Sequence, residues 1–234
     1  GDIRQSFALR YQVYCHQKGF LDSKNYPDGV ETDEFDDASV HIGLYDNRNT
    51  MVGSVRLVTS ESQNFPLNKF CSAHIHDVVS SDDFCLVEIS RLVLNKSRLR
   101  CCSSSLNNKF DRAVKVSNGV VGGREVLNLY KGLYLESKRL GVTHWLAAME
   151  DPLVRLLRRF GFVFKPVGPE VDYYGHVRPY IASISEMEMQ VYRERPFIFK
   201  FFIDNLEQHF KPGIARQEKF FTLSWWAMFS RFLV

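Results

Sequence analysis

Carboxylates and arginines recur on three short segments of this chain, in an order that suggests a polar site. The first segment, VETDEFDD, carries Glu31, Asp33 and Asp36. Arg56 lies in a later run, GSVRLV, and Arg91 follows Glu88 in a third run, EISRLVL. Carboxylates and guanidiniums on short β-rich segments can hold a zwitterion and manage the transfer of one proton. We therefore expect an acidic loop and two strands to build one site together.

The composition predicts a globular protein with a real core. The chain has 234 residues, of which 45% are hydrophobic, so it fits one large domain or one domain with an appendage. Its formal net charge of +3 is too small to favour nucleic acid as a partner. No secretory signal pattern opens the sequence and no run of about 18 apolar residues occurs, which predicts a cytoplasmic protein.

The cysteines and histidines do not form a metal motif. The five cysteines are an odd set without a C-x-x-C pair, namely Cys15, Cys71, Cys85, Cys101 and Cys102. This pattern predicts reduced thiols rather than a disulfide framework. His74 and His76 have an H-x-H spacing but no cysteine or carboxylate at ligand spacing, so we expect no metal site.

The first half of the chain predicts a helix followed by β-structure. Apolar residues at helical spacing predict a helix over 3–18 that ends at Gly19, and the segment 21–30 reads as a loop. Strands are expected over 40–45 and 51–59 as a hairpin, and over 84–94. In a regular strand Glu88 and Ser90 would share one face and Arg91 would lie on the other, whereas a bulge would change this.

The second half alternates helices and strands. Helices are expected over 106–116, over 124–140 with Gly141 at its end, and over 152–160, and strands over 143–149, near 162–167 and over 177–184. This rhythm predicts an α/β fold with a mixed sheet. Residues 185–234 read as two helices broken by Pro212 and Gly213. We expect a domain over 1–184 and a C-terminal helical extension over 185–234.

Five motifs in order carry a resemblance to a known family. They are RYQVY at 10–14, KGF at 18–20, ETDEFD at 31–36, VGSVRL at 52–57 and EISR at 88–91. Together they resemble the autoinducer synthases, the acyl-homoserine-lactone synthase family within the Gcn5-related N-acyltransferase fold, over about residues 3–184. The later segment VGPEVDYYGHVRPY at 167–180 looks more like the long-chain N-acyl amino acid synthases and the acyltransferases associated with exosortase and PEP-CTERM systems.

The resemblance implies a mixed, splayed central sheet flanked by helices, and it marks a set of site residues. That set is Arg10, Phe20, Glu31, Asp33, Asp36, Arg56, Glu88 and Arg91. Phe20 is a departure, because the lactone synthases usually have tryptophan there. The long aromatic C-terminal segment is a second departure from the lactone-synthase plan.

The implied reaction is attack of an amine on a thioester carbonyl. Glu88 is our candidate general base, with Glu31 and Ser90 assigned to the same catalytic group. A backbone N–H near Leu92 is the candidate donor to the oxyanion. The acidic cluster either binds the ammonium of the acceptor or pairs with the arginines to shape the pocket.

The resemblance also implies the donor, an acyl-phosphopantetheine thioester on acyl carrier protein or coenzyme A, with no permanently bound cofactor. Its phosphate would favour the helix start at Gly122, Gly123 and Arg124. An acyl carrier protein would dock on basic residues, which otherwise form solvated faces. These basic residues are Lys96, Arg98, Arg100, Arg155, Arg158 and Arg159.

Aromatic residues raise three further alternatives. The 19 phenylalanines either line an acyl tunnel or fill the core. Tyr173, Tyr174 and His176 could contact the acceptor or protonate the leaving thiolate. The ending WWAMFSRFLV is either a helix packed on the domain or an interfacial anchor that makes the protein membrane-peripheral.

The sequence therefore predicts an N-acyltransferase that moves a medium or long acyl chain from acyl carrier protein, or acyl-coenzyme A, to the α-amine of an amino acid. One alternative is an acyl-homoserine-lactone synthase with S-adenosylmethionine as acceptor. The other is a non-catalytic module that binds acyl carrier protein.

Overall fold

The computed structural model describes residues 3–59, 64–71, 84–95, 97–98 and 123–215. Several predictions from the sequence lie outside these ranges. They are the helix over 106–116, the H-x-H pair, the basic residues Lys96 and Arg100, Gly122, and the aromatic segment after residue 215.

A mixed sheet forms the centre of the molecule. Its strand order is β1-β2-β3-β4-β7-β5, and β6 pairs with β7 outside this path. Neighbouring strands are antiparallel except for β3 and β4, which are parallel. The strands are β1 (Ser39–Tyr45), β2 (Met51–Thr59), β3 (Leu86–Leu94), β4 (His144–Met149), β5 (Lys165–Pro166), β6 (Val171–Asp172) and β7 (His176–Ser183).

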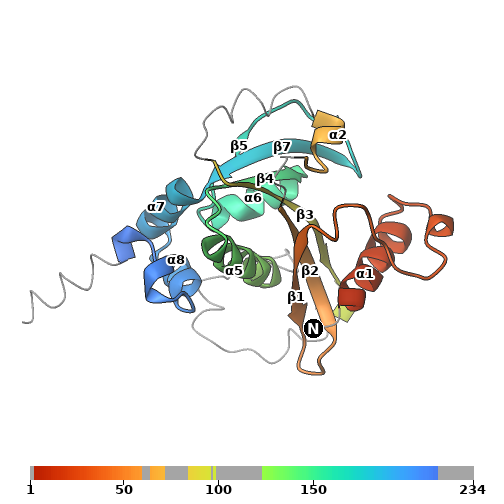
Figure 1. Cartoon of the computed structure of the whole chain (residues 1–234), viewed down its shortest axis with the longest axis horizontal. Helices are drawn as coiled ribbons and strands as arrows, with labels where there is room; N and C mark the ends of the chain where they lie inside the picture. The colour runs from red at the N-terminus through yellow and green to blue at the C-terminus, as the bar shows by residue number, and fades with distance from the viewer. Residues whose placement is uncertain (1–2, 60–63, 72–83, 96, 99–122, 216–234) are drawn as a thin grey trace, which may run out of the picture.

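Helices cover both faces of this sheet (Figure 1). Helix α1 lies on one side of β2 and β3, while α5, α7 and α8 lie on the other side. The helices are α1 (Ile3–Tyr11), α2 (Asn68–Cys71), α5 (Gly123–Arg139), α6 (Asp151–Arg159), α7 (Ile184–Glu194) and α8 (Pro196–Ile203). Short 3-10 turns lie at Ser23–Asn25 and Gln208–Phe210. None of the described helices is long and apolar enough to cross a bilayer.

The alternation of β2 explains how one strand serves two layers. Val55 and Leu57 join the core under α5, whereas Ser54 and Arg56 face α1 and the acidic loop. Because successive strand side chains point to opposite faces, a run that is buried at eight positions can carry both a core face and a polar site face. The predicted hairpin of β1 and β2 is confirmed, with paired positions such as Val40 and Leu57.

Helix α5 supplies the main apolar stripe, as its spacing predicts. Val126, Leu129 and Leu133 are buried, and the same core contains Trp145 of β4. The described part of the C-terminal extension also belongs to this core, through residues such as Phe202 of α8. The chain is non-helical at residues 211–212, as expected for the predicted break at Pro212 and Gly213, and the helix predicted beyond it lies largely outside the described residues. An additional break, which was not predicted, lies at Arg195 and Pro196. Proline lacks an N–H and is tolerated in the first turn of a helix, which is why α8 begins there.

The N-terminal helix is not regular over 3–18. Helix α1 ends at Tyr11, and a π-helix over Gln12–Gln17 continues it. Gly19, with φ of +66°, ends this segment as predicted. π-helical turns insert an extra residue and are frequent at functional sites.

Candidate active site

The parallel strands β3 and β4 separate part-way along the sheet. They pair only from Leu86 to Glu88 on β3, opposite His144 to Leu146 on β4. β3 continues to Leu94 and β4 to Met149, and the two strands line a cavity of about 210 Å³ in that region. The splayed sheet expected from the family resemblance is therefore present, and its opening forms a cleft whose walls include Glu88, Ser90, Arg91 and Leu92.

A bulge in β3 decides which face Arg91 occupies. The pairing with β2 shifts between Ser54, opposite Val93, and Arg56, opposite Ser90, and Arg91 has φ of +53°. An extra residue in a strand changes the side-chain alternation after it. Arg91 therefore bonds Glu31 on the face that also carries Arg56, and the opposite-face arrangement expected of a regular strand does not apply.

Six charged side chains form a buried network beside the cleft. They are Arg10, Glu31, Asp33, Asp36, Arg56 and Arg91, three positive and three negative. Arg10 donates to Glu31 through Nε and makes a bidentate contact with Asp36, at 2.6 Å and 3.1 Å.

Arg56 and Arg91 complete this network. Arg56 Nη1 donates to Asp36 at 2.8 Å, and both of its terminal nitrogens contact Asp33. Arg91 Nη2 bridges Glu31 at 3.0 Å and Asp33 at 2.9 Å. Opposite charges in equal number, with several hydrogen bonds each, make this burial tolerable, because a lone buried charge is very costly.

Two carboxylates of this network, Asp33 and Asp36, have lowered pKa values. Burial alone would raise the pKa of Asp36, but hydrogen bonds and charge from Arg10, with a further bond from Arg56, lower it to about 2. Burial likewise opposes the lowered pKa of Asp33, which results from Arg56 and Arg91. Glu31 is fully buried, bonds Arg10 and Arg91, and does not reach the cleft wall.

Glu88 is different from these acids. It is 2% exposed, lines the cleft, and accepts a hydrogen bond from the backbone N–H of Leu67 at 2.8 Å. Burial raises its pKa to about 8, although the Leu67 N–H and the charges of Arg56 and Arg91 oppose the rise. A carboxyl with a pKa near neutral pH can both hold and release a proton, which is the property of a general base or acid.

Ser90 lies between Glu88 and the network. Its hydroxyl oxygen accepts a hydrogen bond from Arg56 Nε at 3.0 Å, and it lines the cleft. The hydroxyl is therefore oriented by a fixed guanidinium. It links the buried charges to the surface of the cavity.

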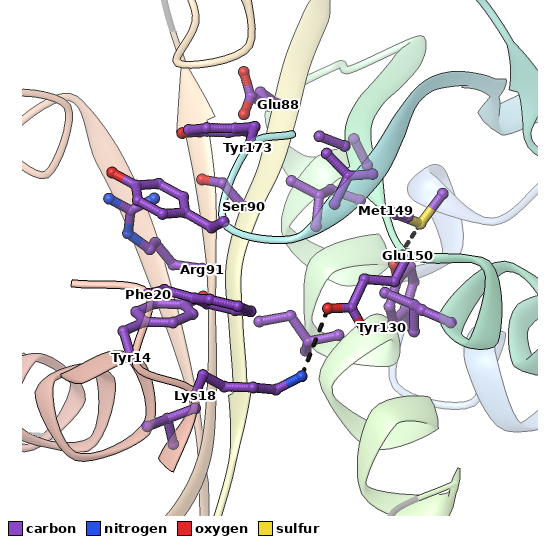
Figure 2. Close-up of a pocket in the computed structure, with 18 residues that line it drawn as sticks. Tyr14, Lys18, Phe20, Glu88, Ser90, Arg91, Tyr130, Met149, Glu150 and Tyr173 are labelled. Carbon is purple, nitrogen blue, oxygen red and sulfur yellow. Dashed lines mark hydrogen bonds and ion pairs between the residues drawn. The ribbon is translucent and has the colours of Figure 1, made fainter. Parts of the chain in front are cut away.

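Aromatic rings enclose Arg91 on the side of the cleft that faces α1. The guanidinium lies 5.6 Å from the ring centroid of Tyr14 and 5.3 Å from that of Tyr174, and those two rings are stacked. Phe20 packs beside both rings, at 6.2 Å and 6.4 Å between centroids. Figure 2 shows Tyr14, Phe20 and Arg91 together on this wall. The π-helical turn carries Tyr14, so the helix irregularity lies in the site itself.

A hairpin tip next to Arg91 and an ion pair at the mouth complete the cleft. The tip between β6 and β7 contributes Tyr173 and Tyr174 to the cleft, and burial raises the pKa of Tyr173 to about 12. Lys18 and Glu150 line the mouth and lie 3.5 Å apart as an ion pair (Figure 2). The sequence singled out the two tyrosines but neither Lys18 as a site residue nor Glu150, since each lies outside the strand motifs.

The residues predicted to bind the donor do not line the cleft. Arg155, Arg158 and Arg159 are exposed on α6, where Arg155 lies 3.7 Å from Asp151. Gly123 and Arg124 begin α5, and Gly123 lies near Leu156 of α6. His176 is exposed beside Glu170 and is separate from the cleft.

No cluster of three or more possible metal ligands exists among the described residues. The polar side chains at and beside the cleft are carboxylates, arginines, four tyrosines, one lysine and one serine. This set favours proton transfer and the binding of charged or polar substrates.

A protein-family model described as an acetyltransferase (GNAT) domain matches residues 9–100, which include the acidic loop, β1, β2 and β3. BjaI, described as a CoA-dependent acyl-homoserine lactone synthase, superposes with a TM-score of 0.58. The superposition covers 86% of this chain and 80% of BjaI at 19% sequence identity. The chain has the Gcn5-related N-acyltransferase fold.

Two further solved structures share this N-acyltransferase fold. TofI, in a ternary complex with an inhibitor and MTA, gives a TM-score of 0.57 at 16% identity over 89% of this chain and 92% of TofI. FeeM, an N-acyl amino acid synthase from uncultured soil microbes, gives 0.54 at 12% identity over 80% of this chain and 86% of FeeM. A comparison with curated protein sequences finds no match.

The comparisons confirm the fold that the five motifs implied. The solved neighbours include both groups that the motifs resemble, the lactone synthases and an N-acyl amino acid synthase. Together with the acetyltransferase family match, they support an acyltransferase.

Proposed function

We propose that this chain transfers an acyl group from a phosphopantetheine thioester to the α-amine of an amino acid. The observation that carries the proposal is Glu88, a buried carboxyl with a pKa of about 8 in the wall of the cleft between β3 and β4. The extended thioester arm can pair with a separated strand edge much as a peptide does. FeeM, which has the same fold, is described as an N-acyl amino acid synthase.

Glu88 suits the first proton transfer of this reaction. The ammonium of an amino acid must lose a proton before its nitrogen can attack, and α-amino groups have a pKa of about 8. A carboxylate of similar pKa can take that proton, directly or through water, without a large energetic mismatch. The nitrogen then bonds to the thioester carbonyl carbon, the C–S bond breaks, and the thiol leaves with a proton.

The other cleft residues have positioning roles in this proposal. A backbone N–H at the bulge, near Leu92, would stabilise the oxyanion. Ser90, oriented by Arg56, lies on the same wall. The network of Arg10, Asp33 and Asp36 would hold Arg56 and the acidic loop in place, while Glu31 would fix Arg91.

The reaction test uses purified protein with acyl thioesters on both carriers and a panel of free amino acids or S-adenosylmethionine. Mass spectrometry of the products decides between the alternatives. N-acyl amino acids support the proposal. Acyl homoserine lactones would replace it with a lactone synthase, the activity described for BjaI. No turnover with any acceptor, together with tight binding of acyl carrier protein, would indicate the non-catalytic module.

Substitution of Glu88 tests its role. Glu88→Gln keeps the size of the side chain and an oxygen that can accept from Leu67, but it removes the base, so turnover falls by about 10²-fold or more. Glu186→Gln, at a carboxylate of similar type in the exposed first turn of α7, is the control and keeps full turnover. Full turnover of Glu88→Gln would remove Glu88 as the base.

The basic face of α6 distinguishes the two possible carriers. Val154, Leu156 and Leu157 are buried while Arg155 and Arg158 are exposed, so charge changes at these two positions leave the core intact. If acyl carrier protein docks there, the double change Arg155→Glu and Arg158→Glu raises KM for the carrier-protein thioester by about tenfold and leaves KM for the coenzyme A thioester unchanged. An equal effect on both donors, or on neither, would contradict docking at α6.

A further inference from the structure

The cleft is open at one end and closed at the other. At the mouth, the side chains of Lys18 and Glu150 are 44% and 41% exposed. At the inner end, Tyr130 of α5 is 1% exposed and Met149 of β4 is 3% exposed. Ile89 and Ala147 form the neighbouring walls, and both are also buried. The buried part of the cleft is therefore apolar, and an acyl chain that enters it would meet the ring of Tyr130.

Tyr130 is a rigid end wall. Its ring packs against Trp145 at 6.1 Å and Phe162 at 5.8 Å between centroids, within the main core. Its hydroxyl donates to Met149 Sδ at 3.9 Å, a weak acceptor. The Tyr130 ring is packed between two other rings and bonded to Met149 of β4. It therefore cannot rotate out of the cleft without disturbing the core.

The size of the cavity limits what can lie in front of this wall. The space bounded by the described residues is about 210 Å³. A protein cavity of about 150 Å³ holds one benzene, so about 210 Å³ corresponds to about eight non-hydrogen atoms. A hexanoyl thioester, with about six carbons, the carbonyl oxygen and the sulfur, reaches that size.

We infer that Tyr130 limits the acyl chain to about six carbons, which makes short-chain acyl thioesters the donor class of this protein. This inference rests on the proposed function. It departs from the medium or long chain that the sequence predicts, since a longer chain would need the space that Tyr130 and its aromatic neighbours occupy.

The test measures binding of the donor alone, so it needs no acceptor. Non-hydrolysable thioether analogues of acyl-coenzyme A and of acyl carrier protein, from two to twelve carbons, are titrated by calorimetry. Each methylene that leaves water raises affinity by about fourfold. In the unmodified protein, affinity rises at this rate up to about six carbons and then levels or falls.

A variant of the end wall and a variant on β4 shift this limit in opposite directions. Tyr130→Leu replaces the ring with a smaller side chain and lengthens the cavity. The affinity should therefore continue to rise with chain length for about two more carbons or longer. Ala148→Leu fills the cleft from β4 and stops the rise about two carbons earlier. Ala148 is only partly buried, so this second variant keeps the inference testable even if Tyr130→Leu does not fold.

Two matched controls separate chain length from general damage. Tyr130→Phe keeps the ring and therefore keeps the limit. Tyr134→Leu changes a buried tyrosine one turn further along α5, outside the cleft, and loses stability without moving the limit. Affinity that rises steadily to twelve carbons in the unmodified protein would overturn the inference and leave the proposed function standing. If no analogue of any length binds on either carrier, the proposed function fails and the inference fails with it.

Discussion

Glu88 differs from the other buried carboxylates in the groups that donate hydrogen bonds to it. Glu31, Asp33 and Asp36 each accept hydrogen bonds from arginines, whereas Glu88 accepts a hydrogen bond from the backbone N–H of Leu67. A buried carboxyl whose hydrogen bond comes from a neutral group favours its own neutral form, because burial penalises the charge. The fold therefore holds Glu88 close to the point at which it gains or loses its proton.

This arrangement makes stability depend on pH in a defined direction. The folded pKa of Glu88 is about 8, above its unfolded value of 4.5, so the folded protein binds more protons in this window. Its contribution to the free energy of unfolding is therefore full below about pH 4.5 and falls as pH rises to about 8. Glutamine cannot ionise, so the melting temperature of Glu88→Gln relative to the unmodified protein should increase from pH 5 to pH 9. Calorimetric melting curves across this range measure the difference, and a constant difference would show that the pKa of Glu88 is normal.

Arg56 has a structural role that is separate from the proton. It is fully buried and joins Asp33, Asp36 and Ser90, so Arg56→Ala leaves two carboxylates with fewer partners. We expect the free energy of unfolding to fall by about 3–5 kcal/mol. Urea unfolding measures this loss. Arg178→Ala, at an exposed arginine on β7, is the control and changes stability by less than about 0.5 kcal/mol. Unchanged stability with lost activity would instead assign Arg56 to substrate binding.

At the scale of elements, irregular backbone builds the site. The bulge at Arg91, the π-helical turn that carries Tyr14, and the hairpin tip at Tyr174, with φ of +51°, each contribute a cleft residue. A regular helix or strand would direct these side chains elsewhere. Strained or irregular backbone at a site is retained because the surrounding packing determines it.

The hairpin tip gives a prediction at this scale. Gly175 has φ of +108°, and a Cβ there would lie 3.2 Å from Glu150 Oε1 and 3.4 Å from Phe20 Cζ. Gly175→Ala should therefore cost about 1 kcal/mol or more, and it should raise KM because the tip carries Tyr173 and Tyr174. Thermal unfolding and steady-state kinetics measure the two effects. Gly213→Ala, which meets no atom within 4 Å, is the control, and an equal effect there would contradict a specific role of the tip.

Across the whole molecule, periodic patterns predict most of the described fold. The spacing of apolar residues along the sequence predicts several elements. These are the apolar stripe of α5, the hairpin of β1 and β2, and the strands β3, β4 and β7. The strand expected near 162–167 is present as the two-residue β5, whereas the equally short β6 was not predicted. Pro196 begins α8 just after α7 ends, a break that was not predicted although proline is a strong signal for a helix boundary.

The site was predictable where charge was unusual and unpredictable where distant segments meet. The acidic loop and the two strand arginines stand out in sequence, and the structure brings them into one network. Lys18, Tyr130 and Glu150 reach the cleft only because the end of the π-helical turn after α1, helix α5 and the end of β4 converge there. The face of Arg91 depends on a bulge, which alternation alone cannot predict. Long-range packing therefore supplies the information that motifs lack.

The shared core of α5, α7 and α8 leads to a prediction about the whole molecule. Phe202 of α8 is 4% exposed and contacts the rings of Tyr134 and Phe162 at 5.5 Å and 5.3 Å between centroids. Phe202→Ala should lower the free energy of unfolding by about 3–5 kcal/mol. Because α8 packs into the same core as Trp145, tryptophan fluorescence and far-UV circular dichroism should shift together as one transition. Phe197 lies on the same helix but is 75% exposed, so Phe197→Ala should leave the fluorescence and circular dichroism unfolding curves unchanged. Two separate transitions, with only the smaller one moved by Phe202→Ala, would show instead that the segment after residue 184 folds as an independent unit.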